Sequence, residues 1–364
     1  MNHSAFETPW ARFLGAATVL LLSGLQLHAC EPPRTSPPAI VSDGDALLAA
    51  WEEPTDDGVT IYVRRIRDLK DGITMFREGT PIYRQKYGVT GYHTPELASG
   101  PDGSIVIVDE GAGKLAIPLD HDGYVAGPPQ PLTGCRSSSL ERACFRTCRR
   151  PIAYAGGFIV GHVSGYSRTP VKSVDLSFLD KMGRTTQFLV LPSAEPYSCV
   201  MAATTEDLVV VSNETAHDGS GVVHVQFLVL SDGSPVKDFT VPGGAARSVV
   251  ALGDRQFAVV YQLVDGRTVV SRFDPDGVIK TWLVPDVDLA TVDLGVSKRG
   301  AFMTWIKDRR VHVRDLPDRH EFASRRVSSS AVGVRATSIG GRCITAWNVA
   351  GGGKLSLLAV PDCP

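Results

Sequence analysis

The residues best suited to chemistry gather in one stretch of the chain. Residues 134–150 contain three cysteines and five arginines but only one acidic residue, Glu141. The arginines are Arg136, Arg142, Arg146, Arg149 and Arg150. A guanidinium group presents several donors in one plane and binds carboxylate, sulfate or phosphate through paired hydrogen bonds. The stretch therefore predicts a site for an anionic group of a partner. The alternative is a disulfide-bonded loop whose arginines are only solvated.

Two further stretches carry polar side chains of the kind that line binding sites. Residues 162–170 contain His162, Tyr166 and Arg168, and residues 213–221 contain His217. In addition, three apolar runs end in a polar residue where comparable runs end in an aromatic one. These polar ends are Asp109, His162 and Ser212. Such groups either bond to nearby loops or remain available to a ligand.

Other chemistries lack the residues they need. The histidines are scattered, without the spacing that a zinc site requires, and no Gly-x-Ser-x-Gly or phosphate-binding loop occurs. The motif from Asp120 to Gly123 lacks the further oxygen ligands that calcium needs and is typical of a turn. The sequence predicts no metal, no cofactor and no catalytic residue.

The N-terminal region carries an address signal. Residues 13–27 are uncharged and mostly apolar, which is too short for a transmembrane helix but suits a secretory signal. The run ends in Leu27, His28, Ala29 and Cys30. An apolar residue three positions before a cysteine, and a small residue directly before it, resemble the bacterial lipoprotein signal. His28 departs from the usual small or hydroxyl residue, so cleavage by ordinary signal peptidase, or a short anchor helix, stays open.

This resemblance implies a chain in three parts. Residues 1–29 are the signal peptide, and Cys30 is the lipidated first residue of the mature protein. Residues 30–39 are rich in proline and form an extended tether, and residues 40–364 form the folded body. Because Glu31 rather than Asp follows the cysteine, the resemblance places the protein in the outer membrane. Its only contact with the membrane is then the lipid.

The remaining cysteines form an even set. With Cys30 lipidated, six of the seven cysteines are left, which in an oxidising compartment predicts three disulfides. The favoured pairs are Cys343–Cys363, Cys148–Cys199 and Cys135–Cys144. The competing arrangement replaces the last two pairs with Cys135–Cys148 and Cys144–Cys199.

The body is a series of strand cassettes. Residues 249–285 show four short apolar runs separated by Asp/Gly turns, which predicts a four-stranded meander that is apolar on both faces. Such a sheet needs copies on either side. Seven cassettes cover residues 40–364, with a period of about 46 residues. This period resembles the WD-repeat and kelch type of β-propeller. Neither family's motif is present, so the resemblance concerns the architecture alone.

The predicted fold is all-β, a seven-bladed β-propeller with four-stranded antiparallel blades. Six or eight blades, or a pair of β-sandwiches, are alternatives. The last cassette has only three strands, and the proline-rich residues before Ile40 suit a closing strand poorly. We therefore expect Cys343–Cys363 to pin the C-terminus. The predicted blade limits are 40–82, 95–133, 150–195, 199–244, 247–287, 291–328 and 331–363.

Function is less constrained than fold. The net charge of −2 provides no field for nucleic acid. The face with the blade-to-blade loops usually carries the ligand, and its longest loops fall in blades 2–4. We expect a monomeric, non-catalytic platform that binds an envelope protein or an anionic polysaccharide there. The alternative is a propeller enzyme acting on polysaccharide, which requires two carboxylates, or Tyr with His, to converge at one end of the channel.

Overall fold

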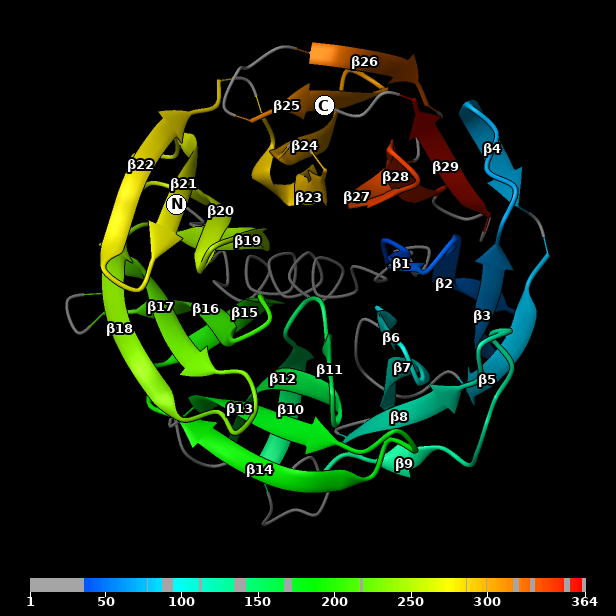
Figure 1. The fold of residues 1–364 in the computed structure, drawn as a ribbon, viewed down its shortest axis with the longest axis horizontal. Coiled ribbons are helices and arrows are strands. Elements are labelled where there is room, and N and C mark those ends of the chain that lie inside the picture. The colour runs from blue at the N-terminus through cyan, green and yellow to red at the C-terminus, as the bar shows by residue number, and fades with distance from the viewer. Residues whose placement is uncertain are drawn as a thin grey trace, which may run out of the picture. The chain divides into compact units, whose positions relative to one another are not determined.

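The computed structural model describes residues 36–361, except residues 77, 87–93, 111–112, 134–141, 167–171, 217–218, 286, 299, 317–320, 328–330 and 350–353. The chain divides into two units, and every described residue belongs to the second, residues 35–364. Seven antiparallel sheets follow one another around an axis (Figure 1). The predicted seven-bladed propeller is confirmed. No helix in the described part of the chain is long and apolar enough to cross a membrane.

Each blade runs outward from an inner strand beside the axis. Blade 1 contains β1 (Ala39–Asp43), β2 (Ala46–Thr55), β3 (Gly58–Ile66) and β5 (Thr80–Lys86). Blade 2 contains β6 (Glu96–Gly100), β7 (Gly103–Glu110), β8 (Gly113–Leu119) and β9 (Gln130–Pro131). Blade 3 contains β10 (Arg142–Thr147), β11 (Ile152–Tyr154), β12 (Gly157–Tyr166), β13 (Lys172–Leu179) and β14 (Thr185–Leu191).

The remaining blades complete the ring. Blade 4 contains β15 (Pro196–Ala203), β16 (Asp207–Thr215), β17 (Gly221–Val229) and β18 (Pro235–Pro242). Blade 5 contains β19 (Ala245–Gly253), β20 (Gln256–Gln262), β21 (Thr268–Asp274) and β22 (Gly277–Leu283). Blade 6 contains β23 (Asp293–Ser297), β24 (Gly300–Lys307), β25 (Arg310–Asp315) and β26 (Glu321–Arg326), preceded by the short helix η2 (Leu289–Thr291). Blade 7 contains β27 (Ala331–Ile339), β28 (Arg342–Val349), β29 (Leu355–Val360) and β4 (Gly72–Phe76).

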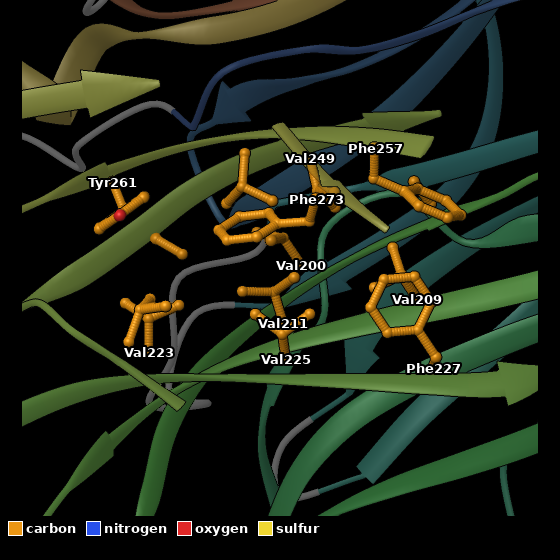
Figure 2. Packing of buried hydrophobic residues seen from close by; sticks show 14 of the residues in the cluster. Val200, Val209, Val211, Val223, Val225, Phe227, Val249, Phe257, Tyr261 and Phe273 are labelled. Carbon is orange, nitrogen blue, oxygen red and sulfur yellow. The ribbon is translucent and has the colours of Figure 1, made fainter. Parts of the chain in front are cut away.

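Neighbouring blades share cores formed by the facing sides of two sheets. Between blades 4 and 5 lies a cluster of valine and aromatic side chains (Figure 2). The ring of Phe227 on β17 lies 5.6 Å from the ring of Phe257 on β20, in an edge-to-face arrangement. Such pairs contribute stability beyond the area they bury. Because every sheet packs against a neighbour on each side, its strands are apolar on both faces.

The ring closes through a strand that was not predicted. After β3, the chain leaves blade 1, pairs β4 with β29 as the outer strand of blade 7, and returns as β5 to complete blade 1. Thr74 lies opposite Leu357 in this pairing. The predicted limits of blade 1, residues 40–82, were therefore wrong for residues 72–76, which belong to blade 7. The residues before Ile40 are indeed unsuited to the role, but a strand from within the first cassette takes it.

Blade 3 also departs from its predicted limits. Residues 142–147 were assigned to a loop, yet they form β10 and pair with the C-terminal half of β12. The short β11 pairs with the N-terminal half of β12. The inner position of this blade is thus divided between two strands, and the residues between them leave the sheet.

Proline substitutions in β4 test the closure. Consecutive N–H groups of an edge strand point alternately toward the paired strand and toward solvent. One of the adjacent variants Ile73→Pro and Thr74→Pro should therefore lose a hydrogen bond to β29 and roughly 2–4 kcal/mol of unfolding free energy, while the other is tolerated. Urea denaturation followed by tryptophan fluorescence measures both. Wild-type stability in both variants would show that β4 does not close the ring.

Candidate binding site at the channel mouth

A disulfide joins blades 3 and 4 beside the channel. Cys148 and Cys199 are bonded, with their Cα atoms 4.6 Å apart, so this predicted pair is confirmed and the competing pairing is excluded. Cys144 and Cys343 each take part in a further disulfide. Their predicted partners, Cys135 and Cys363, lie outside the described residues.

The disulfide belongs to a local detour of the backbone. Between β10 and β11, the N–H of Cys148 donates to the carbonyl of Gly161 at 2.7 Å. The next residue, Arg149, pairs with blade 4 instead: its N–H donates to the carbonyl of Cys199, and its carbonyl accepts from the N–H of Met201, each at 3.1 Å. Arg150 then turns with a φ of 64°. This detour places two consecutive arginines in the channel.

Gly161 makes room for the disulfide. A Cβ at this position would lie 2.7 Å from the Sγ of Cys148 and 2.6 Å from the Sδ of Met201. Neither sulfur has space to retreat, because both residues are buried in the core between blades 3 and 4. The residue opposite the detour must therefore lack a side chain.

Four guanidinium groups and two carboxylates meet where the inner strands begin. Arg149 and Arg150 come from blade 3, Arg247 from β19 and Arg335 from β27, whereas Glu96 comes from β6 and Asp293 from β23. We call these six residues the channel cluster. The six groups carry two more positive than negative charges when all are ionised.

Two of the arginines are paired within the cluster. Arg335 donates to Glu96 at 2.7 Å, and both side chains are almost fully buried. Arg150 donates to Asp293 at 2.8 Å, and Asp293 also accepts from the N–H of Ala336 at 2.8 Å. Burial alone would raise the pKa of Asp293, but the charges of Arg150 and Arg335 and its hydrogen bonds lower it overall. These pairs tie blades 2, 3, 6 and 7 together across the channel.

Arg149 and Arg247 have no such partner. Among the described residues neither forms an ion pair: Arg149 donates to the carbonyl of Arg247 at 3.5 Å, and Arg247 donates to the carbonyl of Ala290 at 2.6 Å. Burial, followed by repulsion from Arg335, lowers the pKa of Arg247 to about 10. Burial and repulsion from Arg335 and Arg247 lower the pKa of Arg149 well below its ordinary value. Both cations are thus less stable here than in water.

A cavity of about 710 Å³ opens above these two arginines. Its wall includes the connection between blades 5 and 6, with Asp288 and Leu289, and the ends of second strands, with Asn213 on β16. Blade-to-blade connections and second-strand ends mark the face that was expected to carry a ligand. Tyr197 at the start of β15 completes the rim on the side of blade 4.

The predicted site residues fall into three groups. Asp109, Arg146 and Arg149 line the cavity, whereas Arg150 does not line it and pairs with Asp293 in the channel cluster. His162 and Ser212 are fully buried inside their blades, and neither is among the residues that line the cavity. Ser212 donates instead to Glu214 at 2.6 Å. The side chains of the others lie outside the described residues; they are Arg136, Arg142, Tyr166, Arg168 and His217.

Blade 5 contributes to the site although the sequence placed the expected site in blades 2–4. Arg247 and Gln262 both line the cavity. A partial signal existed: Glu96 and Asp293 are the first residues of β6 and β23 and Arg247 is the third of β19, whereas Arg335 is the fifth of β27. Charged residues at the starts of otherwise apolar strands would have indicated a shared channel cluster.

Among the described residues, no group of three or more metal-ligating side chains comes together.

Comparisons with known proteins identify the fold only. No family profile and no curated protein matches the chain. The solved Dos1 propeller has a TM-score of 0.51 and 14% identity, covering 86% of this chain and 74% of its own. Hydrazine synthase from Kuenenia stuttgartiensis has a TM-score of 0.57 and 13% identity, covering 92% of this chain and 98% of its own. At such identities the likeness shows a shared propeller and does not transfer a function.

Removing the disulfide tests its role in holding the detour. The bond closes a loop with a sequence separation of 51 residues. The double variant Cys148→Ala/Cys199→Ala should therefore lose about 4 kcal/mol of unfolding free energy, from the added chain entropy of the unfolded state. Gly161→Ala should cost less in this background than in the wild type, because one of the two clashing sulfurs is gone. Urea denaturation of the four proteins gives both values. Equal costs of Gly161→Ala in the two backgrounds would contradict the packing described.

Proposed function

We propose that this protein is a non-catalytic binding platform that holds an anionic group of its partner at the channel mouth. The observation that carries the proposal is the pair Arg149 and Arg247. Both line the cavity, and neither forms an ion pair with a carboxylate of the described chain. A carboxylate, sulfate or phosphate would restore the charge balance of the channel cluster.

Electrostatics favour such a ligand over a neutral one. The lowered pKa values of both arginines mean that their charges are poorly solvated in the free protein. An entering anion would interact with them at lower dielectric than in water and would accept charge-assisted hydrogen bonds. The backbone hydrogen bonds of Arg149 to blade 4 hold its position in advance. Less entropy is then lost on binding.

The carboxylates near the cavity support binding rather than catalysis. Glu96 accepts from Arg335, Asp293 from Arg150, and Asp109 from Lys114, whereas Asp288 at the cavity wall accepts from the N–H of Ala290. A general acid or base needs a group that can exchange protons near the working pH. Burial raises the pKa of Glu52 to about 7, but this residue does not line the cavity and accepts from the N–H of Ser36.

The proposed setting follows from the N-terminal signal. Lipidation of Cys30 and the tether of residues 30–39 would hold a monomeric propeller at the bacterial outer membrane. The partner would then be an envelope protein or an anionic polysaccharide, and no nucleic acid is expected.

Substitution of Cys30 tests the anchor. In wild-type cells, metabolic labelling with palmitate should mark the protein and the membrane fraction should contain it, because the acyl chains bury many CH₂ groups in the bilayer. Cys30→Ser should abolish both the label and the membrane association. Unchanged fractionation of Cys30→Ser would refute lipid anchoring, and a wild-type protein without label would do the same.

Substitution of Arg149 tests the anion site. Arg149→Gln removes a poorly solvated charge, so the free energy of unfolding should rise by roughly 1–2 kcal/mol. The same variant should lose most of the affinity for inorganic sulfate, measured by isothermal titration calorimetry at constant ionic strength. A matched control is Arg184→Gln, because Arg184 is exposed and is already paired with Asp180 at 2.8 Å. Sulfate binding that is equal in both variants would exclude this site.

A further inference from the structure

A second cationic surface lies on blade 6. Arg309, Arg310, Arg325 and Arg326 are all exposed. Arg310 and Arg326 face each other across β25 and β26, and Arg309 lies in the turn between β24 and β25. We call these four residues the blade 6 surface. The strands concerned form the outer part of this blade (Figure 1).

These arginines are not neutralised by neighbouring acids. Among the described residues none of the four takes part in an ion pair, and Arg310 donates only to the hydroxyl and carbonyl of Ser324. Other exposed arginines on turns differ. Arg267 pairs with Asp265 at 2.6 Å, and Arg255 pairs with Asp207 at 2.7 Å. The blade 6 surface therefore groups four arginines that form no ion pair among the described residues, with the exposed Asp308 next to Arg309 as a neighbouring acid.

The blade 6 surface lies on the same face as the cavity. The antiparallel pairing of β23 with β24 places Lys307 at the end where β23 begins. Thr291, two residues before the start of β23, donates to the carbonyl of Ile306 at 3.1 Å and accepts from its N–H at 3.3 Å. The turn that contains Arg309 begins at Asp308, two residues after Ile306. The end of β24 is thus hydrogen-bonded to the connection between blades 5 and 6, and this connection lines the cavity.

A continuous path joins the two cationic sites. Arg247 at the cavity donates to the carbonyl of Ala290, and Thr291 is bonded to Ile306 next to the blade 6 surface. Adjacent strands lie about 4.8 Å apart, so the distance from β23 to β26 is about 14 Å. A single small anion cannot bridge this distance, whereas a chain with repeated charges can.

The apolar surface argues against a protein in this position. The centre of a protein–protein interface is rich in aromatic and apolar side chains. Among the described residues, none of the large exposed apolar side chains belongs to blade 6, and Tyr197 is the one that lines the cavity. Charge without apolar surface suits a flexible polyelectrolyte.

We propose that the partner is an acidic polysaccharide that runs from the channel mouth to the rim of blade 6. One carboxylate or sulfate group occupies the cavity beside Arg149 and Arg247, and groups further along the chain contact the blade 6 surface. The inference rests on the proposed anion site and adds the class of ligand. It predicts that affinity grows with the length of the ligand.

The test compares short and long sulfated ligands on three proteins. The probes are a heparin disaccharide and a heparin decasaccharide, titrated by calorimetry at several salt concentrations, with neutral dextran as a blank. The surface variant carries Arg309→Asn, Arg310→Ser, Arg325→Ser and Arg326→Ser; asparagine suits the φ of 58° at residue 309. A charge-matched control carries Lys181→Ser, Arg184→Ser, Lys237→Ser and Lys280→Ser, all at exposed positions outside blade 6.

The expected result is selective. The wild type and the charge-matched control should bind the decasaccharide more tightly than the disaccharide. The surface variant should lose about tenfold or more in affinity for the decasaccharide, with a salt slope shallower by about 3, because up to four contacts that release counterions are lost. Its affinity for the disaccharide should stay unchanged.

Several outcomes would overturn the inference. The decasaccharide could bind no better than the disaccharide, or the surface variant could bind as the charge-matched control does. Poly-L-glutamate or a single-stranded DNA oligomer could bind the blade 6 surface more tightly than the decasaccharide, which would exclude a polysaccharide. In all these cases sulfate binding that depends on Arg149 would remain, so the anion site would stand. Loss of that dependence would remove both proposals together.

Discussion

Closing seven sheets into a ring forces the first residues of the inner strands into one narrow channel. Charged residues near these positions therefore lie close together, and burial raises the free-energy cost of each unpaired charge. Two ion pairs across the channel offset this cost, Arg335 with Glu96 and Arg150 with Asp293. Because each pair joins different blades, the channel electrostatics and the closure of the ring depend on each other.

Blade 3 is where this arrangement becomes asymmetric. Its inner position is shared by β10 and β11, and the residues between them bond to blade 4. The disulfide from Cys148 to Cys199 holds this detour, and Gly161 gives it space. The consequence is an additional cation, Arg149, that the carboxylates of the cluster do not neutralise. A local irregularity of one blade thus produces the excess charge of the whole channel.

The excess charge places stability and binding in opposition. A channel with a carboxylate beside Arg149 and Arg247 would be more stable but would offer nothing to an anionic partner. Proteins commonly retain such destabilising groups where a ligand later satisfies them. Blade 6 shows a different solution, because its arginines are exposed and cost little stability. Together the two sites suit a ligand that is anchored at one end and held loosely along its length.

The repeat itself could be read from the sequence. Runs of four to eight apolar residues between Asp/Gly turns determine strands, and a regular period determines stacked sheets, because both depend on local conformation and on burial alone. The Cys148–Cys199 pair was also within reach, since equivalent positions in adjacent blades lie close together. Arg149 belonged to the predicted set because residues 134–150 contain five arginines and one acidic residue.

Other features were decided only by the tertiary structure. β4 pairs with β29, more than 270 positions away in the sequence, and its five residues carry no local mark of that partner. Arg247 and Arg335 look like ordinary surface arginines until the ring brings the starts of the inner strands together. His162 and Ser212 look available until the packing of the blades buries them. Local patterns determine which residues form strands, but charge balance and burial depend on neighbours that only the closed ring supplies.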